Sequence, residues 1–462
     1  MRISLVKPFN KFSYSFTPPL GLGYIASMLR INGGHKVTLF EATRDKCSSI
    51  KSFYSFLIQK KPYVVGIQMF SVDILIVKEY LDCIKEIDKK IITVLGGPHP
   101  SAIPHETMDL FGRNLDFIIT GEGEENILML ANKIEEKKSL DQIPGLVWRD
   151  EEGRIIQNKK EMLKDINNLP WPDWELLKPT SYPHAPLGGI SKNFPVAPVI
   201  VSRGCPMNCN FCGGKVIYGN KFRYRAIDNV MEEIQYLRDK FGIREIMIQD
   251  DNLTFRKNVV LEFCQKIKYL QIDWNCLNGI RLDFIDEEIV SAMKDAGCYA
   301  VAVGIESGSQ KILDDMNKKL KLEQIKQKIN ILSKYKMQIV GEFIIGYPTE
   351  TKEDILKTIE FAKSLPIDRA AFANFMPLPG SYIYNQLKEE GRLNNCNYGD
   401  MSYYKVSQSF TSYVSTNELD ILLKKAIRSF HLRPLILYKT VKNIGSFSNF
   451  LNLCRRFVKN YL

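Results

Sequence analysis

The chain has 462 residues, of which 45% are hydrophobic and 25% are charged. This length allows about three ordinary domains of roughly 150 residues each, and the composition is that of a globular protein, which excludes a disordered, collagenous or low-complexity chain. The formal net charge of +11 is uneven, because no acidic residue follows Asp420. The rest of the chain is close to neutral, so no nucleic-acid partner is indicated.

The sequence favours a cytoplasmic protein. No apolar run reaches the roughly 18 residues that a membrane helix needs, and the first residues lack the charged leader and apolar stretch of a signal peptide. The ten cysteines are too sparse for a disulfide scaffold, and three of them lie close together in the chain. This spacing favours a metal site in a reducing compartment.

Five apolar runs separated by amphipathic stretches open the chain. Runs of Val, Ile and Leu with this spacing are typical of buried parallel strands in a doubly wound α/β sheet. They lie at residues 3–6, 36–40, 63–67, 91–95 and 115–120. We therefore expect a Rossmann-like domain over residues 1–130.

A predicted hairpin and a Pro- and Trp-rich passage follow this domain. The hairpin strands lie at 145–148 and 154–157, on either side of the turn Glu151-Glu-Gly. Prolines and tryptophans then recur over 170–186. We expect residues 131–194 to be a connector rather than a core.

A second alternating series occupies residues 195–385. Its apolar runs lie at 197–201, 245–248, 274–277, 299–303, 338–345 and 369–375, and helical patterns between them include Val230 to Lys240, Asp286 to Asp295 and Glu353 to Lys363. Six β/α units predict a partial TIM-like (β/α)6 barrel with its chemistry at the carboxyl ends of the strands. A basic helical region, 386–462, completes the chain.

Three cysteines directly follow the first strand of this series. They are Cys205, Cys209 and Cys212, on a loop that contains Gly204 and Pro206. Three thiolates at these spacings can bind three irons of a 4Fe-4S cluster and leave the fourth iron open to another ligand. A zinc site is the alternative, but zinc usually takes a fourth Cys or His, and none is nearby in the sequence.

This loop resembles that of the radical S-adenosylmethionine (SAM) superfamily, whose signature is CxxxCxxC with an aromatic residue before the third Cys. Phe211 occupies that position. The resemblance covers roughly residues 199–380. It implies that the open iron binds the amino and carboxylate groups of SAM and that the reduced cluster cleaves SAM to a 5′-deoxyadenosyl radical.

The other strand ends carry residues that the resemblance assigns to SAM. Asp250 and Asp251 would face the methionyl ammonium, and Arg281 could form a bidentate pair with a carboxylate. Glu306 and Ser307 fall at the ribose position. Gly346 closes the fifth strand beside the adenine.

Glycine-containing loops follow the strands of the first domain. Glycines there let the backbone approach a bulky ligand at the carboxyl edge of an open sheet. The expected binding residues are Gly66, Ser71, Gly96, Gly97, Pro98, His99, Gly121, Glu122 and Gly123. Together with the barrel, these loops resemble the cobalamin-binding radical SAM enzymes, a subgroup that includes methylases and the anaerobic porphyrin-ring cyclase.

The expected cobalamin site has one departure from many cobalamin proteins. These bind cobalt through the His of an Asp-x-His-x-x-Gly loop, and no His of this chain has Asp two residues before it. The resemblance therefore implies cobalamin without a motif His below cobalt. Methylthio-transferring relatives place three cysteines in the first domain, whereas only Cys47 and Cys83 occur here, which argues against that branch.

The leading hypothesis is a cobalamin-dependent radical SAM enzyme that methylates, or forms a ring at, an unactivated carbon. Its cofactors are a 4Fe-4S cluster, SAM and cobalamin, and its partners are a small-molecule substrate and an electron donor such as ferredoxin or flavodoxin. Two alternatives stay open: a radical SAM oxidoreductase or cyclase without methyl transfer, and a non-enzymatic cobalamin or small-molecule sensor with a structural cluster.

The last residues suggest a membrane contact. Apolar residues recur at helical spacing from Phe450 to Leu462, with Arg455, Arg456 and Lys459 between them. A basic amphipathic helix of this kind is typical of interfacial membrane helices, although a helix docked on the barrel with a solvated basic face fits at least as well. The first interpretation predicts peripheral contact with the inner face of the membrane and a hydrophobic, lipid-like substrate.

Overall fold

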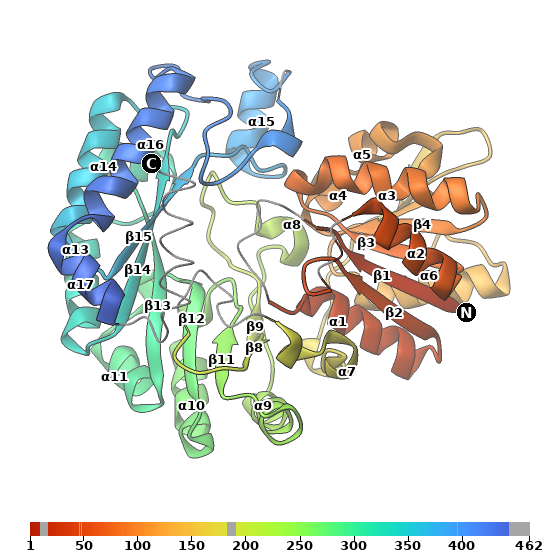
Figure 1. The fold of residues 1–462 in the computed structure, drawn as a ribbon, viewed down its shortest axis with the longest axis horizontal. Coiled ribbons are helices and arrows are strands. Elements are labelled where there is room, and N and C mark those ends of the chain that lie inside the picture. Colours follow the sequence, from red (N-terminus) through yellow and green to blue (C-terminus); the bar gives the residue numbers. More distant parts are fainter. Residues whose placement is uncertain (10–16, 46, 48, 183–190, 395, 443–462) are drawn as a thin grey trace.

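The structure is a computed structural model that describes residues 1–9, 17–45, 47, 49–182, 191–394 and 396–442. It has two α/β lobes side by side, each built on its own sheet (Figure 1). We call them the first lobe, which contains β1 to β7, and the barrel lobe, which contains β8, β11 to β15 and a small antiparallel pair, β9 (Ser202–Arg203) and β10 (Arg223–Tyr224). Helix α8 (Lys215–Tyr218) lies between the lobes.

The first sheet confirms the predicted doubly wound arrangement. Its strand order is β2-β1-β3-β4-β5-β6-β7, and the first five strands of that order are parallel. These five are β1 (Arg2–Lys7), β2 (Lys36–Glu41), β3 (Val64–Gln68), β4 (Ile92–Gly96) and β5 (Phe117–Ile119). The helices of this lobe are α1 (Leu20–Ser27), α2 (Ile50–Lys60), α3 (Ile74–Ile87), α4 (Pro98–Ala102), α5 (Pro104–Phe111) and α6 (Glu124–Glu136).

The predicted hairpin exists but belongs to this sheet rather than to a connector. Its strands β6 (Leu146–Arg149) and β7 (Ile155–Gln157) pair antiparallel, and β6 pairs antiparallel with β5. Without them β5 would be an open edge strand with unpaired backbone groups. The hairpin therefore covers that edge.

The Pro- and Trp-rich passage is part of the core, which corrects the prediction for this segment. Trp174 and Leu177 of helix α7 (Trp174–Leu177) are buried in a hydrophobic cluster that includes residues of both lobes. The Trp174 indole donates to Glu233 Oε1 at 2.9 Å. The indole ring is large enough to fill the space between the lobes.

The barrel lobe contains all six predicted strands in one parallel sheet. Their order is β15-β14-β13-β12-β11-β8. Their bounds are β8 (Val196–Val199), β11 (Glu245–Ile248), β12 (Asp273–Ile280), β13 (Cys298–Glu306), β14 (Gln338–Ile345) and β15 (Arg369–Asn374). Helices between the strands are α9 (Ile227–Phe241), α10 (Lys257–Ile267), α11 (Glu287–Asp295), α12 (Gln310–Asp315), α13 (Leu322–Lys334) and α14 (Lys352–Ser364).

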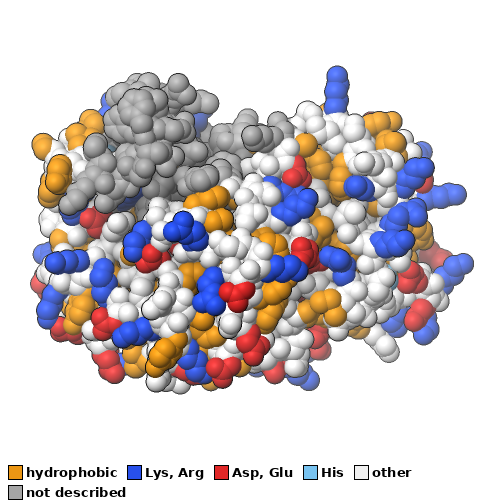
Figure 2. Space-filling model, turned by 60° about the horizontal axis from the view of Figure 1, so that its bottom comes forward, with side chains coloured by type: hydrophobic (Ala, Val, Ile, Leu, Met, Phe, Trp, Pro, Cys, Tyr) orange, Lys and Arg blue, Asp and Glu red, His pale blue; other side chains and the backbone are white. Residues whose placement is uncertain are grey.

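Three helices close the described part of the chain: α15 (Tyr382–Glu389), α16 (Thr416–His431) and α17 (Pro434–Lys442). The predicted amphipathic helix at 450–462 lies outside the described residues. Among the residues that are described, no helix is long and apolar enough to cross a membrane. Basic and acidic side chains are interspersed over the face shown in Figure 2, as expected for a nearly neutral protein body.

Candidate functional site

The three cysteines lie on the loop between β9 (Ser202–Arg203) and α8. The loop leaves β9 through Gly204, which has a φ of +87° and whose Cβ position would collide with the Lys221 carbonyl oxygen. Only glycine fits there without strain. Cys205 and Cys209 are partly exposed and Cys212 is exposed, so the loop presents all three side chains at the surface.

The thiols fit an iron–sulfur cluster chemically. Desolvation by the surrounding protein raises the pKa of Cys205 and of Cys212, although Cys212 keeps contact with solvent, and the nearby Cys209 raises both further. A metal cation offsets this cost by stabilising the thiolates. No group of three His, Cys, Asp or Glu among the described residues could hold a single metal ion. The ligands of a 4Fe-4S cluster each bind a different iron. The three thiols therefore do not have to converge on one metal position.

Arg281 is engaged by protein groups, and its pairing with a SAM carboxylate stays a prediction. It follows β12, and its Nε and Nη2 donate to the carboxylate of Asp283 at 3.0 and 2.9 Å. Its Nη1 donates to Cys209 Sγ at 3.2 Å. Because Asp283 accepts from Nε and Nη2 of the guanidinium, Nη1 is the donor directed toward the cysteine loop.

The two aspartates after β11 have different surroundings. Asp250 is fully buried, and its carboxylate accepts from the backbone N–H groups of Val201 and Ser202, both at 2.8 Å. Burial raises its pKa to about 7. Its carboxylate therefore holds the start of the cysteine loop, and its contact with SAM stays a prediction. Asp251 is exposed beside that loop and accepts from the Gly204 N–H at 3.1 Å.

Glu306 and Ser307 end β13 in two different environments. Glu306 has a φ of +66°, and its Oε1 accepts from Lys318 Nζ at 2.6 Å. Ser307 is fully buried, and its hydroxyl lies 3.1 Å from that of Thr358 on α14. Phe211 is half-buried with Lys318 Nζ 6.0 Å from its ring centroid. The structure thus brings Phe211 and Glu306 together around Lys318, which the sequence analysis did not single out.

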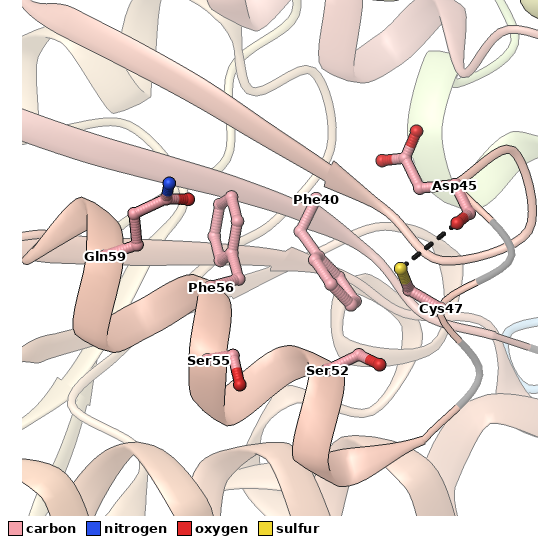
Figure 3. A pocket seen from close by; sticks show the side chains of 7 residues that line it. All are labelled: Phe40, Asp45, Cys47, Ser52, Ser55, Phe56 and Gln59. Carbon is pink, nitrogen blue, oxygen red and sulfur yellow. Dashed lines mark hydrogen bonds between the residues drawn. The ribbon is translucent and has the colours of Figure 1, made fainter.

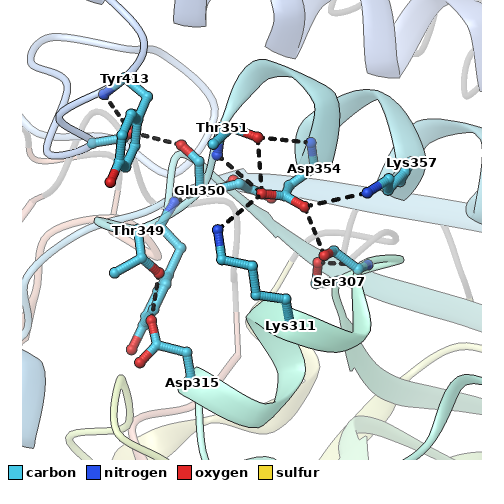
Figure 4. Close-up of polar contacts among 12 residues, drawn as sticks. Ser307, Lys311, Asp315, Thr349, Glu350, Thr351, Asp354, Lys357 and Tyr413 are labelled. Carbon is cyan, nitrogen blue, oxygen red and sulfur yellow. Dashed lines mark hydrogen bonds and ion pairs between the residues drawn. The ribbon is translucent and has the colours of Figure 1, made fainter.

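A hydrogen-bond network holds the loops after β13 and β14 (Figure 4). Gly346 has a φ of +86°, and its N–H donates to the buried carboxylate of Glu350 at 2.6 Å. Burial raises the pKa of Glu350 to about 8. On α14, Asp354 accepts from the Ser309 hydroxyl at 2.8 Å and from the Thr351 hydroxyl at 2.9 Å. These contacts fix the loop that the resemblance places beside the adenine.

Glu342 is an acidic residue of the barrel that the sequence analysis missed. Burial, together with the charge of Glu306, raises its pKa to about 7, and Lys318 opposes the shift. Its Oε2 lies 3.7 Å from the Cβ position of Gly279. Among the described residues nothing donates to it or forms an ion pair with it. A charged residue inside the apolar run 338–345 was the signal that could have identified it.

The predicted cobalamin loops gather at the carboxyl edge of the first sheet. Gly97 follows β4 with a φ of +105°, and its Cβ position would lie 2.8 Å from the Met69 carbonyl oxygen, so glycine is required for this close approach. His99 is buried, its Nδ1 lies 2.9 Å from the Ser71 hydroxyl, and burial lowers its pKa to about 4. The ring is therefore neutral near pH 7.

The remaining members of this set, apart from Gly66, lie at the same edge. Gly66 lies within β3, Gly96 ends β4, and Pro98 begins α4. Gly121 has a φ of +77° directly after β5. Glycine-rich, tightly packed loops on the carboxyl edge of a parallel sheet fit a bulky cofactor.

The turn Gly121-Glu122-Gly123-Glu124 contacts the barrel lobe, which differs from the expectation for Glu122. Its Oε1 accepts from Arg203 at 3.0 Å, and its Oε2 accepts from Arg223 at 2.6 Å. Both oxygens therefore have guanidinium partners from the barrel lobe. Because these partners are far away in sequence, the local pattern could not reveal them.

A shallow depression lies between β2 and α2, lined by Phe40, Asp45, Cys47, Ser52, Ser55, Phe56 and Gln59 (Figure 3). Cys47 donates from its thiol to the Asp45 carbonyl oxygen at 3.1 Å. None of the predicted site residues lines this depression. It is therefore not part of the candidate site.

Two family models match the chain. The model described as the radical SAM superfamily matches residues 199–362, and the model described as the B12 binding domain matches residues 11–130. The first range contains the cysteine loop, and the second contains the glycine-containing loops.

The chain is similar to known proteins over most of its length. It is 30% identical to an uncharacterized methyltransferase of Pyrococcus horikoshii, covering 92% of this chain and 90% of the relative. It is 26% identical to the anaerobic magnesium-protoporphyrin IX monomethyl ester cyclase of Rubrivivax gelatinosus, covering 81% of this chain and 67% of that enzyme. The chain is also similar to a solved structure, that of the radical SAM methyltransferase TsrM from Kitasatospora setae with cobalamin and a [4Fe-4S] cluster bound. The TM-score is 0.70 at 17% sequence identity, and the match covers 84% of this chain and 78% of that chain.

Proposed function

This chain belongs to the cobalamin-binding radical SAM enzymes, and from that premise we propose that it transfers a methyl group to an unactivated carbon of a small molecule. The observation that carries the proposal is the contact between the two lobes, where the turn after β5 meets the strand that leads into the cysteine loop. One active site between the lobes can therefore use both cofactors. Methylation is favoured over ring formation because the relative matched over 90% of its length is named a methyltransferase.

We assign the cluster to Cys205, Cys209 and Cys212 and the cobalamin to the carboxyl edge of the first sheet. When bound, the reduced cluster supplies the electron that cleaves SAM, and cobalamin carries the methyl group. The residues that remain to contact SAM are Phe211, Asp251, Glu306, Glu342 and Gly346. Asp250 and Ser307 would act on the loops that carry these contacts, because both are fully buried in hydrogen bonds.

The test starts from anaerobically reconstituted protein. We expect about four irons per chain, bound cobalamin, and release of 5′-deoxyadenosine from SAM after reduction. Cys209→Ala should lose the cluster and this release, whereas Cys396→Ala, which replaces a cysteine outside the loop, should retain both. Absence of 5′-deoxyadenosine from the reduced, iron-loaded wild type would favour the sensor alternative.

The product then separates the two enzymatic reactions. With SAM labelled in its methyl group and a pool of candidate small molecules, methylation transfers the label to a product. A ring-forming or oxidising enzyme gives an unlabelled product that is lighter by hydrogen atoms. That second result would overturn the methyl-transfer proposal.

A reducing compartment suits this chemistry. All nine cysteines among the described residues are free of disulfides, which supports the cytoplasm as its location. The partners are a small-molecule substrate and an electron donor, and we propose ferredoxin or flavodoxin as the donor.

We further propose that the substrate is hydrophobic and reaches the enzyme at an anionic membrane surface. Helix α17 exposes Leu435, Leu437 and Tyr438 to 63%, 45% and 64%, and the chain from Lys424 onward is basic without any acidic residue. Basic side chains near an anionic bilayer each contribute about 1 kcal/mol. An anionic membrane surface would bind both the exposed apolar side chains of α17 and the basic residues of this region.

Sedimentation with anionic vesicles tests this contact. Full-length protein should pellet at low salt, and a chain ending at Gly445 should pellet much less. Leu435→Ser with Tyr438→Ser should also weaken binding, whereas Tyr269→Ser, at an exposed site on the 3-10 turn after α10, should not. If all of these proteins stay in the supernatant, the substrate has no membrane source.

A further inference from the structure

A buried charge cluster joins the two lobes beside both candidate cofactor loops. Arg203 Nη1 lies 3.0 Å from Glu122 Oε1, and Arg203 Nη2 lies 2.8 Å from Glu124 Oε1. Arg223 Nη1 lies 2.6 Å from Glu122 Oε2. The side chains of Arg203, Glu122 and Glu124 are exposed by only 3%, 1% and 6%. Two guanidinium groups and two carboxylates thus contact one another in a site that is largely shielded from water.

The position of Arg203 is tightly fixed. Its guanidinium lies 4.8 Å from the ring centroid of Tyr24 in the first lobe and 5.3 Å from that of Tyr218 on α8. A guanidinium that stacks on aromatic rings and donates to two carboxylates has one geometry, which an ammonium cannot reproduce. The cluster therefore fixes the position of the backbone that carries Arg203.

Each side of this cluster continues directly into a cofactor loop. Arg203 ends β9, and only Gly204 separates it from Cys205. Glu122 and Glu124 belong to the turn after β5, at the edge assigned to cobalamin. Glu122 Oε2 also accepts from the Leu163 N–H at 3.1 Å, which attaches the segment after the hairpin. A shift of the cysteine loop or of the turn after β5 would therefore displace these buried charged groups from their partners.

Net stability is a poor explanation for such a cluster. Burying ion pairs costs desolvation that their attraction barely repays, and apolar residues of similar size are often as stabilising. In a buried, charge-matched cluster, a shift of one partner leaves a buried charge unpaired, which is strongly destabilising. The placement of this cluster between two reacting centres makes that property useful.

We propose that Arg203, Glu122 and Glu124 are positioning residues that set the separation between the cluster loop and the cobalamin edge. The inference rests on the proposed function. It assigns to the Gly-Glu-Gly-Glu turn a role in aligning the two cofactors in place of direct contact between Glu122 and cobalamin. Loss of the alignment should impair reactions that need both centres and spare those that need the cluster alone.

The main variant is Arg203→Lys, which keeps the positive charge but loses the forked contact and the stacking. Asp116→Asn is the control, because Asp116 forms a partly buried ion pair with Lys85 at 2.7 Å whose two partners both lie in the first lobe. If Arg203→Lys yields too little folded protein, Glu124→Gln is the milder variant, since it leaves the pair between Arg203 and Glu122 in place.

The readout is the distance between the two paramagnetic centres, measured by pulsed dipolar electron paramagnetic resonance on protein holding the reduced cluster and cob(II)alamin. Wild type and Asp116→Asn should give one narrow distance. Arg203→Lys, or Glu124→Gln to a smaller extent, should give a broader or longer distribution. A distribution identical to that of wild type would overturn the proposal.

Kinetics give a second readout. In Arg203→Lys, transfer of the labelled SAM methyl group to bound cobalamin should fall about tenfold or more, because small misplacements cost large factors in rate. Release of 5′-deoxyadenosine should stay within about twofold of wild type, as no SAM-contacting residue is changed. An equal fall in both would mean a purely structural role. If wild type itself binds no cobalamin or no cluster, the proposed function fails before the variants are compared.

Discussion

The carboxyl of Glu342 lies in the barrel without a hydrogen-bond or ion-pair partner among the described residues, and its pKa is raised to about 7. A hydroxyl or ammonium group of SAM that donates to it would bind the ionised form. Because protonation removes the acceptor, SAM affinity should rise from pH 6 to pH 8. The gain should be up to about tenfold for each unit by which SAM lowers this pKa.

Equilibrium binding of SAM to reconstituted protein at the two pH values measures this effect. Glu342→Gln should bind SAM with nearly equal affinity at both. Glu323→Gln, at an exposed site on α13, should behave like wild type. If the Glu342→Gln variant keeps the full pH dependence, another group is responsible.

Arg281 should tune the cluster rather than bind SAM. Its Nη1 donates to Cys209 Sγ at 3.2 Å, and hydrogen bonds to cluster sulfurs raise the reduction potential. In Arg281→Gln the potential should fall by on the order of 60 mV, the equivalent of one charge-assisted hydrogen bond of about 1.5 kcal/mol. A potentiometric titration followed by paramagnetic resonance gives the value, and an unchanged potential would refute the assignment.

Among the elements, the hairpin β6–β7 offers a matched pair of glycines. Gly145 enters it with a φ of +67°, and its Cβ position would lie 2.9 Å from the Thr120 carbonyl oxygen, whereas Gly153 in the hairpin turn has a φ of +82° and open space around it. Alanine costs about 1–2 kcal/mol at either site because of its φ. At residue 145 it should cost about 1–3 kcal/mol more because of crowding.

Thermal unfolding of the two alanine variants tests this difference. Gly145→Ala should lower the unfolding midpoint clearly more than Gly153→Ala, since only the first disturbs the join between β5 and the hairpin. Equal shifts would mean that the hairpin edge contributes little to the stability of the first sheet.

At the scale of the whole molecule, helix α15 and the segment after it contact the first lobe. Tyr398 packs edge-on against His99 with ring centroids 5.8 Å apart, and Lys388 forms an ion pair with Glu106 at 2.6 Å. Because burial holds the pKa of His99 near 4, the neutral ring stabilises the fold above pH 6.5, and this stability is lost as the pH falls toward 4.

Tyr398→Ala should therefore expose His99 and raise its pKa by about two units, toward the ordinary value of about 6.5. The chain has five histidines, so ring-labelled nuclear magnetic resonance with His99→Gln for assignment can follow this group. Tyr413→Ala, at an exposed site of the C-terminal region, is the control. A pKa that stays near 4 in the Tyr398→Ala variant would show that other contacts bury the ring.

Local features of the chain were readable from the sequence. All six barrel strands, the five parallel strands of the first sheet, and helices α9, α11 and α14 fall where hydrophobic periodicity predicts them. The cysteine loop follows the first barrel strand as its spacing predicts. Each of these depends on neighbouring residues, because strand and helix periods and loop ligands are set within a few positions.

Contacts between distant segments were decided only by the tertiary structure. The pairing of Glu122 with Arg203 joins residues 81 positions apart, and the burial of Trp174 depends on both lobes. The hydrogen bond from Arg281 to Cys209, 72 positions away, likewise depends on how the chain returns to the cysteine loop. Sequence spacing identifies a charged or aromatic residue, but its partner is chosen by desolvation, which only the packed lobes determine.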